Sequence, residues 1–150
     1  MAFLSSFDIC ASGLSAQRLR MEIASENISN IDTTRTEAGG AYRRKEVVFE
    51  SYGTNSFRDA LRNAAKGKGI SSTGVGVRVA EIVEDDREMK MVYNPEHPDA
   101  DENGYVEMPN VDLLKETVDS MSATRSYDAN VTALNAMKLM AQKALEIGKS

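Results

Sequence analysis

Apolar and small residues recur at alternating intervals of three and four along the N-terminal part of the chain. One polar residue interrupts the series, which consists of Phe7, Cys10, Leu14, Gln17, Met21, Ala24, Ile28 and Ile31. This heptad spacing places the series on one face of a helix. No proline occurs in this stretch, so the sequence predicts a long amphipathic helix from about Leu4 to Ser29.

The C-terminal part shows the same periodicity over a longer stretch. Neither proline nor glycine occurs between Asn110 and Ile147, and Gly148 then stands where helices commonly end. We expect Asn110 to be the N-cap and Asp112 to lie in the first turn. The apolar stripe is wide, which favours more than one packing partner. Its members are Ala123, Tyr127, Asn130, Val131, Leu134, Met137, Ala141, Ala144 and Leu145.

Residues with high β-propensity occupy the region between these two stretches. The segment 42–52 contains Val47, Val48 and Phe49, and apolar residues alternate with other residues at 75–79 and again at 89–93. We expect these last two segments to form a hairpin through the acidic turn 84–88. Residues 53–74 contain four glycines and are interpreted as a mobile insert with a short helix-like piece.

These patterns together predict a mainly α fold with a small β-rich middle, of the α+β class. We expect three parts, namely a long N-terminal helix in 1–34, a β-rich central region with a short hairpin in 35–108, and a long C-terminal helix in 109–150. The first and third parts are expected to pair as a coiled-coil-like domain.

Composition argues against several classes of protein. The 150 residues carry 18 Lys and Arg against 23 Asp and Glu, a net charge of −5 that argues against a general nucleic-acid binder. One cysteine (Cys10) and one histidine (His97) exclude an internal disulfide framework and a multi-histidine metal centre. No apolar run is long enough to span a membrane, and the N-terminus lacks the regions of a secretory signal. We expect a non-enzymatic protein without a cofactor, catalytic residue, metal site or small-molecule substrate.

Two short motifs resemble parts of functional sites but lack residues that a complete site needs. Asp99, Asp101 and Asn103 precede Gly104 with the spacing of the first half of an EF-hand calcium loop. The twelfth position of that loop needs a bidentate glutamate but is an asparagine, so we interpret the segment as an acidic turn. His97 lacks the accompanying groups that would complete a catalytic site.

Charge is distributed in blocks along the chain. Residues 35–69 carry a net charge of +4, with Arg43, Arg44 and Lys45 as the densest positive group, and residues 70–110 carry −7. Complementary blocks favour head-to-tail contact between neighbouring copies, because opposite charges steer association and fix the register. The alternative is that both blocks are solvated faces.

Asparagines stand on or beside both helical stripes, at Asn27, Asn30, Asn130 and Asn135. An asparagine in a helix seam costs stability but selects register and partner. Alternatively, Asn27 and Asn30 simply end the first helix.

The chain resembles the flagellar rod and hook proteins over nearly its whole length. The N-terminal motifs that carry the resemblance are Ser12–Gln17, Arg20-Met21, Ala24-Ser25, Asn27–Asn30, Thr34–Thr36, Gly39-Gly40 and Tyr42–Lys45. The most specific motif is Tyr93–Ala100, followed by Gly104–Val106 and Pro109–Val111. Near the C-terminus the matching segments are Ser122–Val131, Leu134–Ala136 and Lys143–Leu145.

This resemblance implies a structural subunit of the proximal rod of the bacterial flagellar basal body, the drive shaft for motility. It implies self-assembly through the terminal helices with copies of the chain, the rod proteins FlgB, FlgF and FlgG and the rod-base adaptor FliE. It also implies contact with the flagellar type III export apparatus, export without a cleaved signal peptide, and a place in the rod outside the cytoplasmic membrane, in the periplasmic space where there is one.

From the stripes and the basic group we predict a subunit interface that consists of Phe7, Leu14, Gln17, Met21, Ala24, Asn27, Ile28, Asn30, Arg43, Arg44, Tyr127, Asn130, Val131, Leu134, Met137, Ala141 and Leu145. A cytosolic coiled-coil scaffold or export chaperone is the alternative function, which explains the terminal helices but not the β-rich middle. An acidic calcium-binding module explains residues 99–104 alone.

Overall fold

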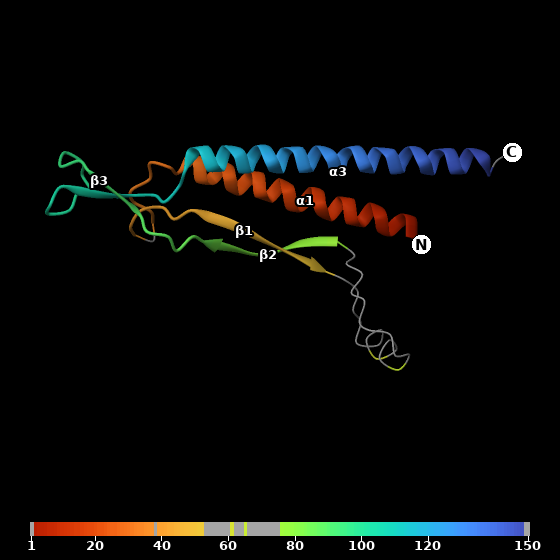
Figure 1. Cartoon of the computed structure of the whole chain (residues 1–150), viewed down its shortest axis with the longest axis horizontal. Helices are drawn as coiled ribbons and strands as arrows, with labels where there is room; N and C mark the ends of the chain where they lie inside the picture. Colours follow the sequence, from red (N-terminus) through yellow and green to blue (C-terminus); the bar gives the residue numbers. More distant parts are fainter. Residues whose placement is uncertain (1, 38, 53–60, 62–64, 66–75, 149–150) are drawn as a thin grey trace. The chain divides into compact units, whose positions relative to one another are not determined.

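The chain begins with one long helix and ends with another, and four short strands lie between them in sequence (Figure 1). The computed structural model describes residues 2–37, 39–52, 61, 65 and 76–148. Its elements are α1 (Ala2–Ser29), β1 (Lys45–Tyr52), β2 (Gly76–Glu84), β3 (Lys90–Tyr93), β4 (Tyr105–Met108) and α3 (Leu113–Ile147). The predicted fold class, mainly α with a small β-rich middle, is confirmed. The predicted insert 53–74 lies outside the described residues except for Leu61 and Ala65.

Both predicted helices are present, but the start of α3 differs from the prediction. Asp112, not Asn110, caps the helix, because its Oδ1 accepts hydrogen bonds from the N–H groups of Leu114 at 3.0 Å and Lys115 at 3.4 Å. Asn110 lies outside the helix and is buried. The prediction treated Asn110 as a local signal for the start of a helix, whereas its side chain forms hydrogen bonds with residues far away in the sequence.

The strands do not form the hairpin that the sequence predicted between residues 75–79 and 89–93, so that prediction is wrong. β2 pairs with β1, and Figure 1 shows the two strands running in opposite directions. β3 pairs instead with β4, a strand that the alternation pattern did not reveal, in an antiparallel register that sets Val92 opposite Val106. The acidic segment between β2 and β3 does not form the expected hairpin turn, because β2 and β3 belong to different sheets. At the end of β2, the N–H of Asp85 donates to the carbonyl of Arg44 at 2.8 Å.

A tight turn explains why β3 and β4 form the hairpin. Gly104 has a φ of +80°, which favours glycine. Asp101 Oδ1 accepts hydrogen bonds from the N–H groups of Asn103 and Tyr105 at 2.9 and 2.8 Å. This is an Asx-type turn, so the acidic turn predicted for residues 99–104 is present.

The chain divides into two compact units. The first contains residues 1–16, 49–80 and 126–150, and the second contains residues 17–48 and 81–125. In the first unit α1 approaches α3 closely, since a Cβ added at Gly13 would lie 3.1 Å from Nδ2 of Asn130. Ser12 Oγ accepts a hydrogen bond from the N–H of Val77, so the same helix also contacts β2.

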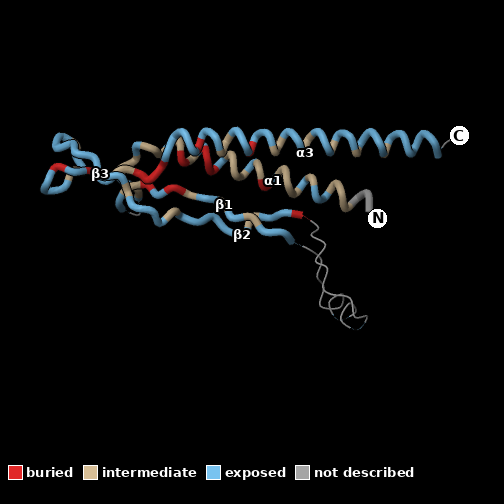
Figure 2. The backbone as a smooth tube through the Cα atoms, viewed as in Figure 1, coloured by how far each residue is buried: buried red, intermediate tan, exposed pale blue. Residues whose placement is uncertain are grey.

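The second unit holds most of the buried residues, which cluster where the end of α1 meets the start of α3 (Figure 2). Its apolar core is small and consists of Ile23, Ala24, Tyr42, Val106, Pro109, Val111 and Ala123. Four polar residues are buried with this core, namely Asn27, Arg44, Asn110 and Glu116. Buried polar groups need hydrogen-bond partners, so each of these four side chains has to be paired inside the unit.

Replacing the N-cap tests the observed start of α3. We expect Asp112→Ala to lower the free energy of unfolding by about 1 kcal/mol, because two N–H groups in the first turn lose their acceptor. Asp112→Asn keeps a capping oxygen and is the control, with stability close to that of the wild type. Urea denaturation measures both, and an alanine variant as stable as the asparagine variant would contradict the cap.

Candidate functional site

Asn27 is the point at which three segments of the second unit meet. Its side chain has 0% exposure near the end of α1. Its Nδ2 donates to Oε2 of Glu116 and to the carbonyl of Lys45, both at 2.9 Å. Its Oδ1 accepts from the hydroxyl of Tyr42 at 3.0 Å and from the N–H of Lys45 at 2.9 Å. The amide therefore uses both its donor and acceptor groups to join α1, β1 and α3.

An ion pair lies beside this junction. Nε of Arg44 donates to Oε1 of Glu116 at 2.6 Å, and the two residues are only 3% and 1% exposed. Both carboxylate oxygens of Glu116 are thus occupied, one by Arg44 and the other by Asn27. A buried carboxylate keeps its charge only when such partners replace the lost water.

Further carboxylates surround the guanidinium group of Arg44. It forms ion pairs with Glu46 at 2.9 Å, Asp119 at 3.5 Å and Asp85 at 3.6 Å. Asp119 is shared with Arg20 of α1 at 3.2 Å, so a second bridge connects the two helices. We call Arg20, Asn27, Arg44, Glu116 and Asp119 the junction cluster.

Asn110 holds the backbone next to the junction cluster. Its Oδ1 accepts from the N–H of Arg44 at 2.8 Å, and its Nδ2 donates to the carbonyls of Asp85 at 3.0 Å and Arg87 at 3.3 Å. One side chain therefore fixes the start of β1, the segment after β2 and the approach to α3. This role explains why Asn110 does not cap the helix.

Burial and charge shift several pKa values in this region. Burial lowers the pKa of Arg44, but the hydrogen bonds and charges of Glu116 and Glu46 together outweigh this effect, so the net direction is upward. The hydrogen bond from Arg87 holds the pKa of Asp85 well below its usual range. Burial raises the pKa of Tyr42 to about 12, and the charges of Glu26, Glu116 and Glu84 act in the same direction. The phenol thus stays protonated and donates to Asn27.

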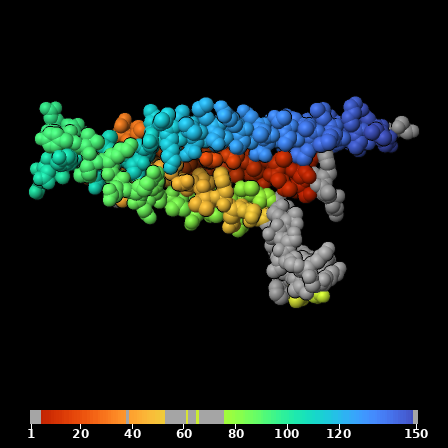
Figure 3. All heavy atoms as spheres, viewed as in Figure 1, coloured from red at the N-terminus to blue at the C-terminus, as the bar shows by residue number. Residues whose placement is uncertain are grey.

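Beyond the junction cluster, α3 presents apolar residues on two sides. The predicted stripe is half-buried at six positions, which we call the inner stripe: Tyr127, Asn130, Val131, Leu134, Met137 and Ala141. A second series on the opposite side is exposed, and its spacing of three, four, seven or eight residues keeps it on one helix face. We call it the outer stripe, and it consists of Leu114, Val118, Met121, Ala129, Ala136 and Leu139, with Arg125 and Thr132 interrupting the series on the same face. Figure 3 shows this long helix along the upper edge of the view.

The structure locates each residue of the predicted interface as follows. Three are in the interior of the second unit, namely Ala24, Asn27 and Arg44. Arg43 and Leu145 are exposed. The others are half-buried, namely Phe7, Leu14, Gln17, Met21, Ile28, Asn30, Tyr127, Asn130, Val131, Leu134, Met137 and Ala141. Asn27 does more than end the helix, because it bonds across the second unit, whereas Nδ2 of Asn30 donates to the carbonyl of Glu26 within the same turn.

Sequence reasoning missed Glu116, Asp119 and the outer stripe. A signal for Glu116 was present, since extending the stripe of Ala123 by one heptad toward the N-terminus reaches it. A charged residue at an inward position indicates a buried partner of opposite charge. The predicted stripe covers one face of α3 only, so it does not include the outer stripe.

No cation site emerges from the acidic residues that the structure describes. These residues contain no group of three or more His, Cys, Asp and Glu side chains arranged to hold a metal ion. His97 lies 3.9 Å from Asp99, and its Nδ1 accepts from the N–H of the same residue at 3.2 Å. Within the described residues, neither α1 nor α3 has an apolar stretch sufficient to cross a membrane.

Comparison with known proteins gives consistent matches at both ends and over the full length. Residues 7–35 match a family model described as flagella basal body rod protein, and residues 102–147 match one described as flagellar basal body rod FlgEFG protein C-terminal. The flagellar basal-body rod protein FlgC of Bacillus subtilis (strain 168) is 50% identical, over 99% of this chain and 100% of its own length. The proteins of the same name from Borreliella burgdorferi and Salmonella typhimurium are 43% and 44% identical, over 98% and 99% of this chain and 98% and 100% of their own lengths.

Removing Glu116 tests the junction cluster. We expect Glu116→Ala to lower the free energy of unfolding by about 3–5 kcal/mol, because it leaves the guanidinium group of Arg44 buried without its main partner. Glu107→Ala, at an exposed position, is the matched control and should change stability little. Replacing both members in Arg44→Met/Glu116→Leu should recover much of the loss, and equal loss in the single and double variants would contradict a paired interior charge.

Alkaline unfolding tests the hydrogen bond from Tyr42. Its folded pKa of about 12 lies above the ordinary value of 10.0, so the folded state retains the proton more strongly than the unfolded state. The stability that results is complete below pH 10.0 and is lost as the pH rises toward 12. We expect the wild type to lose about 2 kcal/mol more than Tyr42→Phe across this window in urea titrations. Parallel pH profiles for the two proteins would contradict the assignment.

Proposed function

Because this chain belongs to the family of flagellar basal-body rod proteins named FlgC, we propose that it is the proximal-rod subunit and assembles through both sides of its terminal helices. The family makes it a structural subunit of the basal-body rod, which associates with other rod proteins. The finer part of the proposal concerns which surfaces bind and where in the rod the subunit lies.

The exposed outer stripe of α3 is the observation that carries this proposal. Leu114 is 74% exposed and Leu139 is 61% exposed, although both lie on a helix whose opposite side already packs within the chain. Burying apolar surface of this kind on a neighbour contributes roughly 25 cal/mol per Å². A helix that is apolar on two sides suits a lattice, because each subunit then contacts more than one neighbour.

We assign different tasks to the two stripes. The inner stripe, together with Phe7, Leu14 and Gln17 of α1, pairs the terminal helix segments 1–34 and 109–150, and its half-buried members complete their burial against neighbouring subunits. The outer stripe faces a different neighbour. Residues 35–108 form the central region that lies between these segments in sequence, and the junction cluster fixes Arg44, just before β1, to α3.

The partners follow from this position in the rod. We propose contacts with copies of the chain, with the rod proteins FlgB, FlgF and FlgG, and with the adaptor FliE at the rod base. We further propose that the chain reaches the rod through the flagellar export apparatus without cleavage of a signal peptide, and that it works outside the cytoplasmic membrane, in the periplasmic space where there is one. Met121, Met137 and Met140 on α3 support packing against non-identical neighbours, because methionine side chains adapt to different shapes.

A charge on the outer stripe should separate assembly from folding. We expect Leu139→Glu to leave the helix content and urea stability of the purified subunit unchanged but to prevent rod formation, because the carboxylate would be buried against a neighbour. Gln142→Glu adds the same charge at an exposed polar position of the same helix and should allow normal rods. Basal bodies are counted in electron micrographs, and swimming is measured in soft agar.

Leu134→Asp on the inner stripe supplies the contrasting case. This substitution should lower both subunit stability and rod formation, because Leu134 packs within the chain as well. Normal rods in cells that carry Leu139→Glu would contradict the role of the outer stripe.

A further inference from the structure

One face of the β3–β4 hairpin packs against nothing in the described part of the chain. Directly paired residues of an antiparallel ladder lie on the same face, so Val92 and Val106 share one face, and Met91, Tyr93, Tyr105 and Glu107 share the other. On the first of these faces Val106 is 2% exposed and Val92 is 46% exposed, so that face is buried at Val106 only. Tyr93 on the opposite face is 64% exposed, and its ring contacts that of Tyr105 edge to face at a centroid distance of 5.3 Å.

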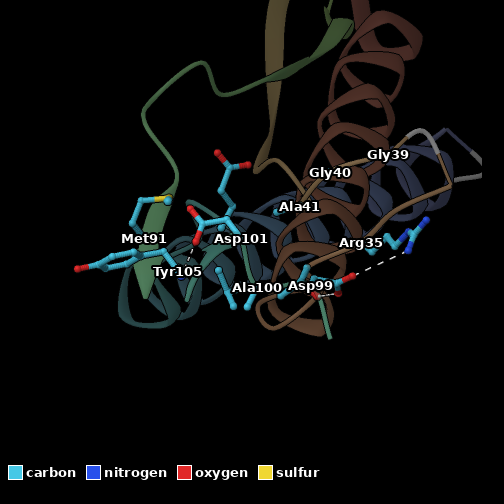
Figure 4. A pocket seen from close by; sticks show the side chains of 12 residues that line it. Arg35, Gly39, Gly40, Ala41, Met91, Asp99, Ala100, Asp101 and Tyr105 are labelled. Atoms are coloured by element: carbon cyan, nitrogen blue, oxygen red, sulfur yellow. Dashed lines mark hydrogen bonds and ion pairs between the residues drawn. The ribbon is translucent and has the colours of Figure 1, made fainter. Parts of the chain in front are cut away.

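An open groove adjoins this face (Figure 4). It has a volume of about 550 Å³ and lies between the loop 34–41, the turn 99–101 and strands β3 and β4. Figure 4 shows Met91 and Tyr105 side by side at one end, and Arg35 directed toward Asp99 at the other. The groove therefore combines an apolar wall with polar side chains. We call the groove and the exposed hairpin face together the hairpin site.

The hairpin site carries a net negative charge. Its carboxylates are those of Asp99, Asp101 and Glu107, all of which line the groove. Arg35 at 3.9 Å from Asp99 is the basic residue that lines the groove. Among the described residues, Glu107 has no ion-pair partner. A suitable occupant is therefore cationic and also carries apolar side chains.

We propose that the hairpin site binds residues 57–68 of a neighbouring copy of this chain. That segment contains Arg58, Arg62, Lys66 and Lys68 against a single acidic residue, together with Phe57 and Leu61. Three of its basic residues recur at intervals of four. Arginine and lysine side chains suit both the carboxylates and the faces of exposed tyrosine rings.

The length of the connecting chain permits this contact. A Cβ added at Gly76 would lie 3.0 Å from the ring of Tyr52, so the two residues that flank 53–75 lie side by side. A residue about 12 positions from either flank can lie at most about 40 Å from them, the length of a fully extended chain. This distance is sufficient for the segment to contact an adjacent subunit.

The two surfaces of this contact are different, which determines the kind of assembly. A contact between unlike surfaces is heterologous and repeats from copy to copy, and it builds an open helix when the rotation between copies does not close into a ring. The inference rests on the proposed function to the extent that neighbouring copies must be present in the rod. It adds a specific head-to-tail contact to the helix packing described above.

Cysteine cross-linking between two different chains tests the contact. Cys10→Ser removes the native thiol, and one cell produces two versions of the chain, one with Leu61→Cys and the other with Met91→Cys. We expect purified basal bodies to contain a cross-linked dimer of the two versions, formed only when both are present. Leu61→Cys paired with Ile82→Cys, an exposed apolar position outside the groove, is the control and should give no dimer.

Charge reversal adds a second measurement. We expect Glu107→Lys in the Met91→Cys chain to lower the cross-link yield roughly two- to fivefold, as expected for one exposed ion pair. Arg62→Glu in the partner chain should restore the yield, whereas Glu88→Lys outside the groove should leave it unchanged.

Two outcomes would overturn the inference: motile cells with normal rods but no dimer, or an equal yield with Ile82→Cys. Absence of rods in cells with a charged outer stripe bears on the proposed function alone, so the two proposals fail separately.

Discussion

The burial of the Arg44 guanidinium group is the constraint on which the second unit depends. A charged group can leave water only if fixed partners replace its hydration, and here Glu116 supplies the closest of them. Glu116 is held in turn by Asn27, so a residue of α1, one of the segment leading into β1 and one of α3 must be correctly placed together. The small apolar core of this unit gives little orientation by itself, because apolar packing is not directional. The polar contacts define which helix faces meet and in which register.

The two sides of α3 differ in what covers them. A helix in an isolated protein has one apolar side, whereas α3 has a half-buried inner stripe and an exposed outer stripe. The chain alone therefore leaves much apolar surface in water. Such a helix is understandable in a subunit whose final environment is built from other subunits. The fold of one chain and the structure of the assembly share the same helix.

The sequence predicted the helices well and the long-range polar contacts poorly. The end of α1 at Ser29, the extent of α3 to Ile147 and the fold class were all accessible, because helical periodicity and the absence of proline are local signals. The partner of β3 was not accessible, because β4 has only four residues and its pairing depends on the turn that Asp101 and Gly104 form.

The junction cluster illustrates the same limit. Arg44 stood out only as part of a basic run, and nothing local distinguishes it from exposed Arg43. Its burial depends on carboxylates that lie more than seventy positions away in the sequence. The interface positions inferred from the stripes were accessible as a pattern, but a helix face does not specify which neighbour covers it.

The long sequence separation within the junction cluster has a consequence for the timing of folding. Asn27 and Glu116 are 89 positions apart, so the hydrogen bond between them cannot form until most of the chain has emerged from the ribosome. Closing such a long loop also costs conformational entropy, and contacts that form earlier between nearby residues do not offset this cost. The contacts that Glu116 and Asp119 make with Asn27 and Arg44 therefore form only after the start of α3 has been synthesised. The order of synthesis thus places the completion of this polar interior late in the life of the growing chain.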